Sequence, residues 1–487
     1  MTPQAAPTFT GPTPTSPIGS DGHPPTPTAT VTPLPVPTPT PTATATATAT
    51  STPTPTATPL LRSERARIAH LLRRAGFGAS EEELNQYEAM GLAGTVDYLL
   101  DYEHVDDSAL EAKLQSLNFD LTKTGDLQRW WLLRMVYSKR PVREKMTLFW
   151  HGLLTSGVSR VSRAEYMWKQ NQLFRQQALG SFPVLLKAVS RDPAMLIWLD
   201  SQSNKKSAPN ENFARELMEL FSMGVGNYTE QDVRESARAF TGWSLGSTGF
   251  TFNAAQHDDG VKQFLGQSGP FTGDDIIDII VRQPAAADYI CGKLFRFFAY
   301  DPPEPTILAT LHTTFVDNGY STKAVMRALL TSEAFFAPNA YRSRIKSPAE
   351  FVVGTLRTLS ITTDGNTLPN LLARMGQTLF DPPSVAGWPG GPAWINSVTL
   401  LERVNFANLV ATNRKNFDPR GMITKGNPTP KEVLDYFINH LLDGNIAPSE
   451  SAVMNTYSDD VARIATPDAA ARAIAYLVLG SPDFQLA

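Results

Sequence analysis

The stretch NENFARELMELFSMGVGNYTEQDVRESARAFTGW, residues 210–243, predicts two consecutive helices. In its first half, apolar residues recur at the i, i+4, i+7 and i+8 positions of a core-facing helical stripe. These residues are Phe213, Leu217, Leu220 and Phe221. Gly224 and Gly226 then supply a helix stop and a turn. The segment therefore favours a mainly α fold built from short amphipathic helices.

The second helix of this stretch begins with a capping box. Thr229 supplies the hydroxyl at the helix start, and Asp232 follows three residues later, so each side chain can satisfy a free backbone N–H of the first turn. We expect this helix to continue to Thr241 and Gly242 and to end at Trp243. The two helices should then pack as a hairpin.

Opposite the apolar stripe, the first helix carries a polar face. Its residues are Asn212, Arg215, Glu216 and Glu219, with Glu211 at the edge and Asn210 just before it. Arg215 lies four residues from both Glu211 and Glu219, which is ion-pair spacing on a helix. If this face looks into a cleft, crowding separates the pKa values of Glu216 and Glu219, which suits acid–base catalysis. Two alternatives are a solvated face and a buried structural network that reaches Arg234 or Arg238.

The remaining chain divides into a low-complexity segment and a helical domain. Residues 1–60 are nearly all Thr, Pro and Ala, so we expect them to be disordered, with an extended length of roughly 190 Å at about 3.1 Å per residue. Such spacers commonly tether extracellular domains. Residues 61–487 read as one multi-helix globular domain with few short strands, of which FTF (250–252) gives the clearest signal. We expect sub-lobes at 61–205, 206–410 and 411–487, in an arrangement that could be toroid-like.

Composition excludes several classes of protein. The chain has 487 residues, 42% of them apolar, and a net charge of -4 without long charged blocks, which argues against nucleic acid as a partner. No run approaches the ~20 apolar residues of a membrane span. Cys291 is the only cysteine, in an apolar context that predicts a buried residue. Residues 1–12 show no signal peptide, so an extracellular or cell-surface location is inferred from the spacer alone.

No familiar cofactor or metal motif occurs. HExxH, CxxC, Walker A and Rossmann patterns are all missing, so the cofactor stays unknown. His257 and Asp258 lie on a predicted loop and could bind a divalent metal together with Glu216, although this spacing is not diagnostic. His151 follows Trp150 in an apolar helix, where a core histidine is more common than a catalytic one.

Three tryptophans are predicted on loops or at element ends. They are Trp243, Trp388 and Trp394, the last two within the Pro/Gly-rich segment 381–394. An exposed indole in such a place can stack on a sugar ring. The alternative, slightly favoured, is that these rings pin irregular loops to the core.

Taken in order, several segments resemble a bacterial family known as domain of unknown function 1800. The resemblance covers roughly residues 62–485, and its most specific part is NENFARELMEL. The segments are RIAHLLRRAGFG, REKMTLFWH, LIWLD, NENFARELMELFSMGVGNYTEQDV, ARAFTGW, HDDG with FLG, and GWPGGPAWI with LLERVNFAN. The resemblance implies export and a partner that resembles the alkaline phosphatase and sulfatase superfamily, but no activity. Many relatives carry a second histidine where this chain has Leu153, so a metal site there is in doubt.

Three hypotheses follow from these observations. The first is an exported hydrolase of a polysaccharide or similar polymer, with Glu216 or Glu219 as general acid, another carboxylate as base, and Arg215 holding the charge in place. The second is a non-catalytic surface or assembly module whose polar helix is a structural network. The third is a metal-dependent enzyme that uses His257, Asp258 and Glu216.

Overall fold

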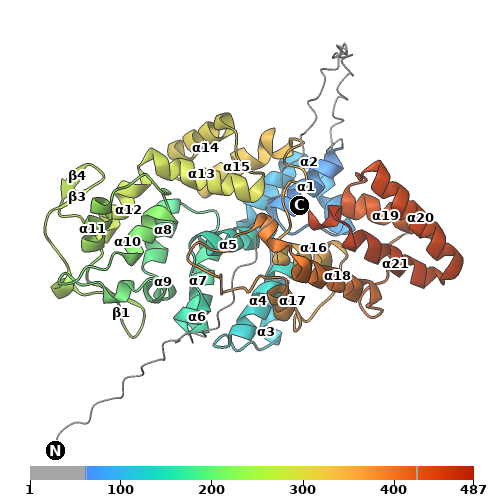
Figure 1. Cartoon of the computed structure of the whole chain (residues 1–487), viewed down its shortest axis with the longest axis horizontal. Coiled ribbons are helices and arrows are strands. Elements are labelled where there is room, and N and C mark those ends of the chain that lie inside the picture. Colours follow the sequence, from blue (N-terminus) through green and yellow to red (C-terminus); the bar gives the residue numbers. More distant parts are fainter. Residues whose placement is uncertain (1–60, 62, 424–425) are drawn as a thin grey trace, which may run out of the picture. The chain divides into compact units, whose positions relative to one another are not determined.

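The computed structural model describes residues 61, 63–423 and 426–487 (Figure 1), so the predicted disordered spacer at 1–60 lies outside the described residues. The described chain is mainly α, as the sequence predicts. Its first helices are α1 (Glu64–Ala75), α2 (Glu81–Leu100), α3 (Ser108–Ser116), α4 (Thr124–Tyr137), α5 (Pro141–Leu153), α6 (Val158–Val161), α7 (Ala164–Gln176), α8 (Phe182–Ser190) and α9 (Pro193–Trp198). Pro141 opens α5, where its missing N–H costs nothing.

The middle of the chain contains the two helices of the 210–243 stretch. The helices here are α10 (Asn212–Glu219), α11 (Glu230–Ala239), α12 (Gly273–Val281), α13 (Pro284–Phe298), α14 (Pro305–Asp317) and α15 (Thr322–Thr331). Thr229 and Asp232 form the predicted capping box of α11. Gly224 and Gly226 have the left-handed φ values of 80° and 87° that the turn between α10 and α11 requires.

The prediction that the second helix reaches Trp243 is wrong. Helix α11 ends at Ala239. Phe240 and Thr241 donate their N–H groups back to Ser236 and Arg238 in a turn, and Gly242 then hydrogen-bonds to other segments. Gly242 donates its N–H to the carbonyl oxygen of Asn204 (3.0 Å), and its carbonyl oxygen accepts from the N–H of Asn253 (2.8 Å). Its φ is 82°, and a Cβ there would lie 2.6 Å from the carbonyl oxygen of Asn253. Trp243 therefore begins a strand.

The four strands form two small antiparallel hairpins. Strand β1 (Trp243–Leu245) pairs with β2 (Phe250–Phe252), and Trp243 lies opposite Phe252. This confirms the strand signal at FTF. Strand β3 (Lys262–Phe264) pairs with β4 (Gln267–Gly269).

The last third of the described chain is again helical. Its helices are α16 (Pro348–Thr358), α17 (Leu368–Arg374), α18 (Ser397–Thr412), α19 (Pro430–Leu442), α20 (Pro448–Ile464) and α21 (Pro467–Gly480). Helices α19, α20 and α21 pack on one another, and α18 packs along α21 (Figure 1). The 3₁₀ turns are η1 (Tyr102–His104), η2 (Ser201–Ser203), η3 (Ala254–Gln256), η4 (Ala334–Phe336), η5 (Gly391–Trp394) and η6 (Asp483–Gln485).

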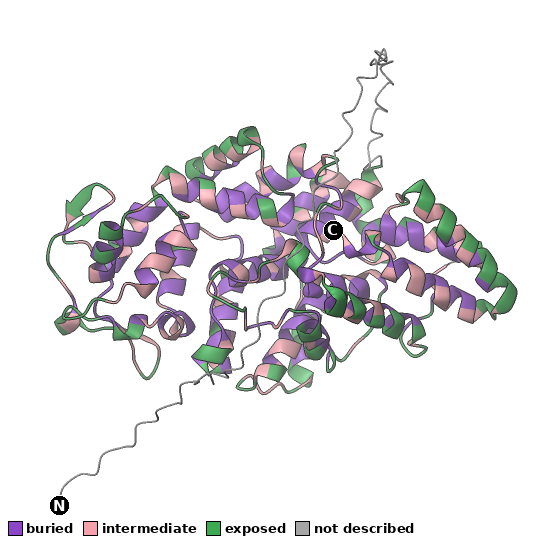
Figure 2. Ribbon diagram, viewed as in Figure 1, coloured by how far each residue is buried: buried purple, intermediate pink, exposed green. Residues whose placement is uncertain are grey.

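Two hydrophobic clusters form the core of the described domain. Helices α1, α2, α5, α8 and α10–α15 contribute to the first, and α4, α16–α19 and α21 contribute most of the second. The buried residues lie on the facing sides of the helices, as Figure 2 shows. Cys291 is fully buried in the first cluster, as predicted. Within the described residues, no helix is both long and apolar enough to cross a lipid bilayer.

Candidate functional site

The polar face of α10 is half-buried and forms an ion-pair network with α11. Arg215 donates from Nη1 and Nη2 to the two carboxylate oxygens of Glu230 at 2.7 and 2.9 Å, and from Nη2 to Glu211 Oε2 at 3.3 Å. The network therefore joins the two helices through Glu230. The predicted partners Arg234 and Arg238 bind elsewhere, Arg234 to Gln231 and Arg238 to Glu235 and Asp258.

Glu216 and Glu219 have different surroundings on this face. The hydroxyl of Tyr228 donates to Glu219 Oε2 at 2.7 Å. Partial burial, and then the charge of Glu219, raise the pKa of Glu216, while Arg215 opposes the shift. Glu216 therefore holds a proton more readily than a glutamate free in water does.

Asn210 and Asn212 tie the start of α10 to the preceding segment. The side-chain amide of Asn210 donates to the carbonyl oxygen of Asp200 (3.2 Å), and its Oδ1 accepts from the N–H of Asn212 (3.0 Å). The amide of Asn212 donates to the carbonyl oxygen of Leu199 (3.3 Å). Their observed contacts are thus mainly with the backbone of this chain, and Asn210 also contacts the side chains of Ser203 and Asn204.

His257 and Asp258 are occupied by contacts of their own. His257 is buried, and its Nδ1 lies 2.8 Å from the carbonyl oxygen of Thr241. Arg238 Nε donates to Asp258 Oδ2 at 2.7 Å, and this bond lowers the pKa of Asp258 against its partial burial. Among residues 61, 63–423 and 426–487, no three His, Cys, Asp or Glu side chains gather closely enough to hold a metal ion. His257, Asp258 and Glu216 therefore do not form a metal site as a group.

His151 lies in the core. It is 1% exposed, and aromatic rings surround it, with centroids between 5.4 and 6.3 Å away. These rings belong to Trp131, Phe174, Phe380 and Trp388. Burial lowers the pKa of His151 to about 3, so its imidazole is neutral near pH 7. A catalytic role, which stays a prediction, would require Trp388 to move aside.

The three tryptophans differ in exposure. Trp243 and Trp394 are buried, so these two indoles pin their loops to the core, and only a small part of either ring is exposed. Trp243 packs edge-on against Phe240 and Phe250. Trp388 is half-buried and packs edge-on against His151.

A cleft of about 1070 Å³ opens in the described domain. Its walls come from α5, the end of α10, α13 with the proline-rich loop 301–305, the segment 339–347, and the loop 386–394. Its aromatic lining residues are Phe149, Tyr289, Phe297, Tyr300, Trp388 and Trp394. A concave, partly apolar space with a few polar groups is the usual form of a ligand site.

One wall of the cleft is a single face of α13. Tyr289, Lys293, Arg296 and Phe297 line the cleft at spacings of three and four residues, which place them on one side of a helix. Lys293 Nζ lies 5.1 Å from the ring centroid of Tyr289. Arg296 Nε donates to Asp301 Oδ1 at 2.7 Å. Tyr289 and Phe297 therefore lie on either side of the two cationic residues along roughly 12 Å of helix, at 1.5 Å per residue.

Another wall is the loop 386–394, which contacts the end of α5 closely. Gly387 has a φ of 83°, and a Cβ on it would lie 2.2 Å from the carbonyl oxygen of Gly152. The hydroxyl of Thr155 donates to the carbonyl oxygen of Val385 just before this loop. Only glycine fits at position 387, and this contact fixes the place of Trp388.

A buried ion pair lies at the base of the cleft. Lys145 Nζ donates to Glu350 Oε1 at 2.5 Å, and the N–H of Ser347 donates to Glu350 Oε2 at 2.8 Å. Burial alone would raise the pKa of Glu350, but Lys145 and Arg344 outweigh it and hold the pKa far below its usual range. Burial lowers the pKa of Lys145 to about 8. Glu350 is therefore a permanent anion rather than a proton donor.

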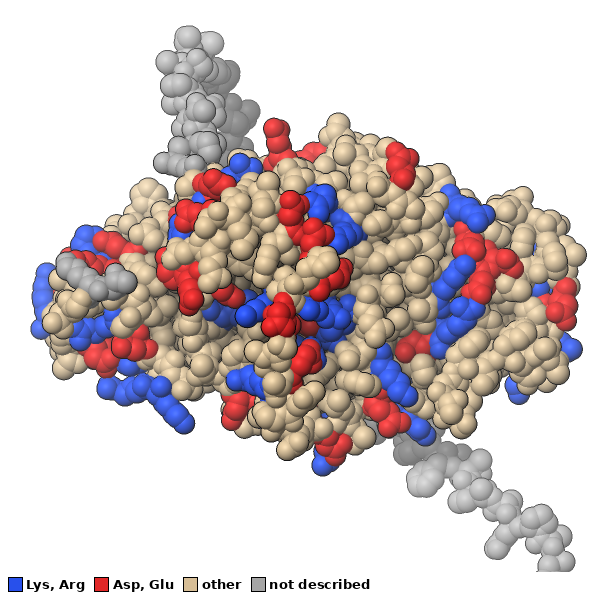
Figure 3. Space-filling view, turned by 180° about the vertical axis from the view of Figure 1, so that it is seen from behind, with Lys and Arg blue, Asp and Glu red and all other residues tan. Residues whose placement is uncertain are grey.

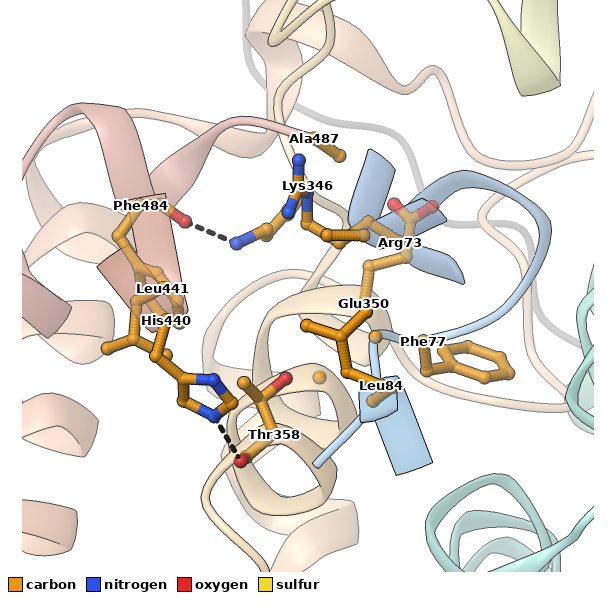
Figure 4. A pocket seen from close by; sticks show the side chains of 14 residues that line it. Arg73, Phe77, Leu84, Lys346, Glu350, Thr358, His440, Leu441, Phe484 and Ala487 are labelled. Atoms are coloured by element: carbon orange, nitrogen blue, oxygen red, sulfur yellow. Dashed lines mark hydrogen bonds between the residues drawn. The ribbon is translucent and has the colours of Figure 1, made fainter. Parts of the chain in front are cut away.

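Glu350 also lines a second hollow, of about 40 Å³ (Figure 4). Lys346 Nζ donates to the carbonyl oxygen of Phe484 (2.6 Å), and His440 Nε2 lies 2.9 Å from the carbonyl oxygen of Thr358. Its volume suits only a few waters, because a single water needs about 10–15 Å³ measured in this way. The larger cleft is therefore the candidate site.

The cleft reaches the end of α10. Leu220, which caps α10, lines the cleft, and its carbonyl oxygen accepts from the hydroxyl of Tyr289 at 2.7 Å. Glu216 lies four residues before Leu220, one helical turn away on the same side of the helix. The charge of Glu219 also acts on Tyr289. The carboxylate pair is thus adjacent to one end of the cleft, although neither residue lines it.

Sequence reasoning named two residues that line the cleft, Trp388 and Trp394, and missed the face of α13. The available signal was the spacing of Tyr289, Lys293 and Phe297, which places a basic residue between two aromatic ones on one helix side. That signal alone is ambiguous, because the same helix buries Ile290, Leu294 and Phe298 on its other side.

Comparison with known proteins gives one finding. Neither the curated proteins nor the solved structures provide a match to this chain. One family model, described as protein of unknown function (DUF1800), matches residues 70–486. The segments of the 210–243 stretch and of the 387–394 loop both fall within this match. The chain therefore belongs to the DUF1800 family.

Proposed function

We propose that this protein is an exported or cell-surface hydrolase that binds a polysaccharide or similar polymer in the aromatic cleft. The observation that carries the proposal is the cleft of about 1070 Å³, whose walls present aromatic rings from two sides. Trp388 faces it from the 386–394 loop, and Tyr289 and Phe297 face it from α13. Ring faces of this kind stack on the apolar faces of sugars.

Cleavage takes place, in this proposal, at the α10 end of the cleft. Glu216 acts as the general acid, because its surroundings raise its pKa. Glu219, which accepts a hydrogen bond from Tyr228, acts as the second carboxylate. The Thr/Pro/Ala-rich composition of residues 1–60 supports placing the protein outside the cell.

The test separates binding from cleavage. Polymer binding and release of reducing ends are measured on a panel of neutral and charged polysaccharides with the parent protein and with Trp388→Ala, Glu216→Gln and Glu219→Gln. We expect Trp388→Ala to weaken binding about tenfold, since one stacked ring contributes roughly 1–1.5 kcal/mol. Both Gln variants should bind normally and lose at least about 100-fold in rate. Full activity in both Gln variants would refute the catalytic assignment.

A second candidate function is a non-catalytic binding module. The bidentate bond of Arg215 to Glu230 favours it, because this bond assigns part of the polar face to joining α10 with α11. On this reading the parent protein binds polymer but releases no reducing ends. Glu230→Gln then lowers the melting temperature slightly and leaves binding unchanged, since the pair is largely exposed.

A further inference from the structure

Lys293 is a cation on the cleft wall that stands apart from the ion pairs around it. Its side chain is half-buried, and its one recorded contact is with the ring of Tyr289. Arg296, one turn further along α13, is paired with Asp301. Burying a charged ammonium without an opposite charge is unfavourable. Lys293 therefore has the character of one half of an ion pair, and the described residues place no carboxylate in direct contact with it.

The electrostatic surroundings of Lys293 point the same way. Burial, and then the charge of Arg296, lower the pKa of Lys293, and Asp301 offsets them only in part. Arg344 contributes a further positive charge to the lining, donating from Nη1 to the carbonyl oxygens of Arg296 and Phe297. Glu350 is already satisfied by Lys145 and the N–H of Ser347. An anionic group beside Lys293 would offset both the cost of burying its ammonium group and the repulsion from Arg296.

We propose that the polymer held in the cleft is an anionic polysaccharide, and that one of its sulfate or carboxylate groups pairs with Lys293 between the rings of Tyr289 and Phe297. This inference rests on the proposed function, because it specifies the charge of the polymer that the aromatic walls bind. The anion approaches the Nζ of Lys293 from the cleft, while the flanking sugar rings stack on the aromatic side chains.

The other charges of the cleft argue for a polymer with widely spaced anionic groups. Asp301, Glu304 and Glu350 also line the cleft, so a ligand with a charge on every unit, such as a nucleic acid, would meet repulsion. Neutral sugar units between charged ones can donate their hydroxyls to these carboxylates. Acidic and basic side chains are also intermixed on the face in Figure 3, and the net charge is -4, which disfavours general attraction of polyanions.

The experiment compares polymers that share a backbone and differ in charge. Binding of the full chain to dextran, dextran sulfate and carboxymethyl dextran of equal length is measured by affinity electrophoresis at low and at physiological salt. We expect at least about tenfold tighter binding of one charged form than of dextran, because one charge-assisted hydrogen bond is worth about 1.5 kcal/mol or more. The two charged forms distinguish a sulfate site from a carboxylate site.

Variants locate the effect at Lys293. Lys293→Gln should lose about tenfold in affinity for the charged polymer, Lys293→Arg should retain it, and binding of neutral dextran should not change. Lys415→Gln removes an exposed cation away from the cleft lining and should leave all affinities unchanged. Equal melting temperatures of the parent and Lys293→Gln show that the fold is intact.

The outcomes separate this inference from the function on which it rests. Equal binding of charged and neutral dextran, weakened in both cases by Trp388→Ala, refutes the anionic preference and leaves the polymer cleft standing. Equal losses in Lys293→Gln and Lys415→Gln, or tighter binding of single-stranded DNA than of dextran sulfate, also refute it. Failure to bind any polymer of the panel refutes both proposals.

Discussion

At the scale of single residues, burial of a charged group without an opposite charge in contact shifts its pKa strongly. Asp192 begins α9 and is buried, and its Oδ1 accepts from the N–H groups of Ala194 and Met195 and from the amide of Gln170, at 2.9 to 3.2 Å. Burial nevertheless raises the pKa of Asp192 to about 7. The proton is therefore bound more tightly in the folded than in the unfolded chain.

This shift predicts a stability that falls with rising pH. Because the folded pKa lies above the unfolded value of about 3.9, the contribution of Asp192 is complete below pH ~4 and is lost as pH rises to about 7. The unfolding free energy of Asp192→Asn minus that of the parent should therefore be about 3 kcal/mol larger at pH 8 than at pH 5, at about 1.4 kcal/mol per pKa unit. Urea denaturation at both pH values measures the gain.

The exposed Asp459 provides the control for this prediction. The unfolding free energy of Asp459→Asn should equal that of the parent at both pH values. If the unfolding free energies of Asp192→Asn and the parent differ by the same amount at pH 5 and at pH 8, the raised pKa of Asp192 is contradicted.

At the scale of elements, the loop 386–394 shows how one backbone contact positions a side chain. Gly387→Ala should cost at least about 2 kcal/mol, because it adds left-handed strain to a clash with the carbonyl oxygen of Gly152. We expect it also to displace Trp388 and to weaken polymer binding as strongly as Trp388→Ala does. Thermal melting and affinity electrophoresis measure the two effects.

Gly391, in the same loop, is the matched control for Gly387. Its φ is 53°, but a Cβ there would meet no atom within 4 Å. Gly391→Ala should therefore cost only about 1 kcal/mol of conformational strain and leave binding unchanged. Equal effects of the two substitutions would show that the contact with Gly152 does not hold the loop.

The α10–α11 pair shows how far sequence reasoning reaches at this scale. The apolar stripe is confirmed at Phe213, Leu217 and Phe221, which are buried, because helical periodicity is a local property. The end of α11 could not be predicted, because Gly242 hydrogen-bonds to Asn204 and Asn253, which lie well outside the helix. Likewise, nothing local indicates that Tyr289 meets Leu220.

At the scale of the whole domain, buried ion pairs join segments far apart in the chain. Arg73 on α1 donates to both carboxylate oxygens of Asp443 after α19, at 2.8 and 2.5 Å. The hydroxyl of Tyr341 donates to the same carboxylate at 3.0 Å. Asp443 is 2% exposed, so this pair is well shielded from water. It therefore links the first described helix to the C-terminal helices.

Breaking this link should destabilise the domain. Asp443→Asn keeps a residue that tolerates the left-handed φ of 53° and removes only the charge. We expect a loss of about 3 kcal/mol, because Arg73 then remains as an unpaired, largely buried cation. Asp435→Asn removes the exposed partner of Lys431 and should cost less than about 0.5 kcal/mol. Equal losses in the two variants, measured by denaturant unfolding, would contradict this role of Asp443.

Local patterns and ordered motifs were enough to predict the fold class, the helix starts at capping boxes such as Thr229–Asp232, and the family. The burial of Trp243 and His151, the pairing of Arg215 with Glu230, and the cleft that α13 and the 386–394 loop both line became evident only in the folded chain. The physical reason is that the exposure and pKa of a side chain depend on residues that folding brings near it. Their separation along the chain can exceed a hundred residues, as between Lys145 and Glu350.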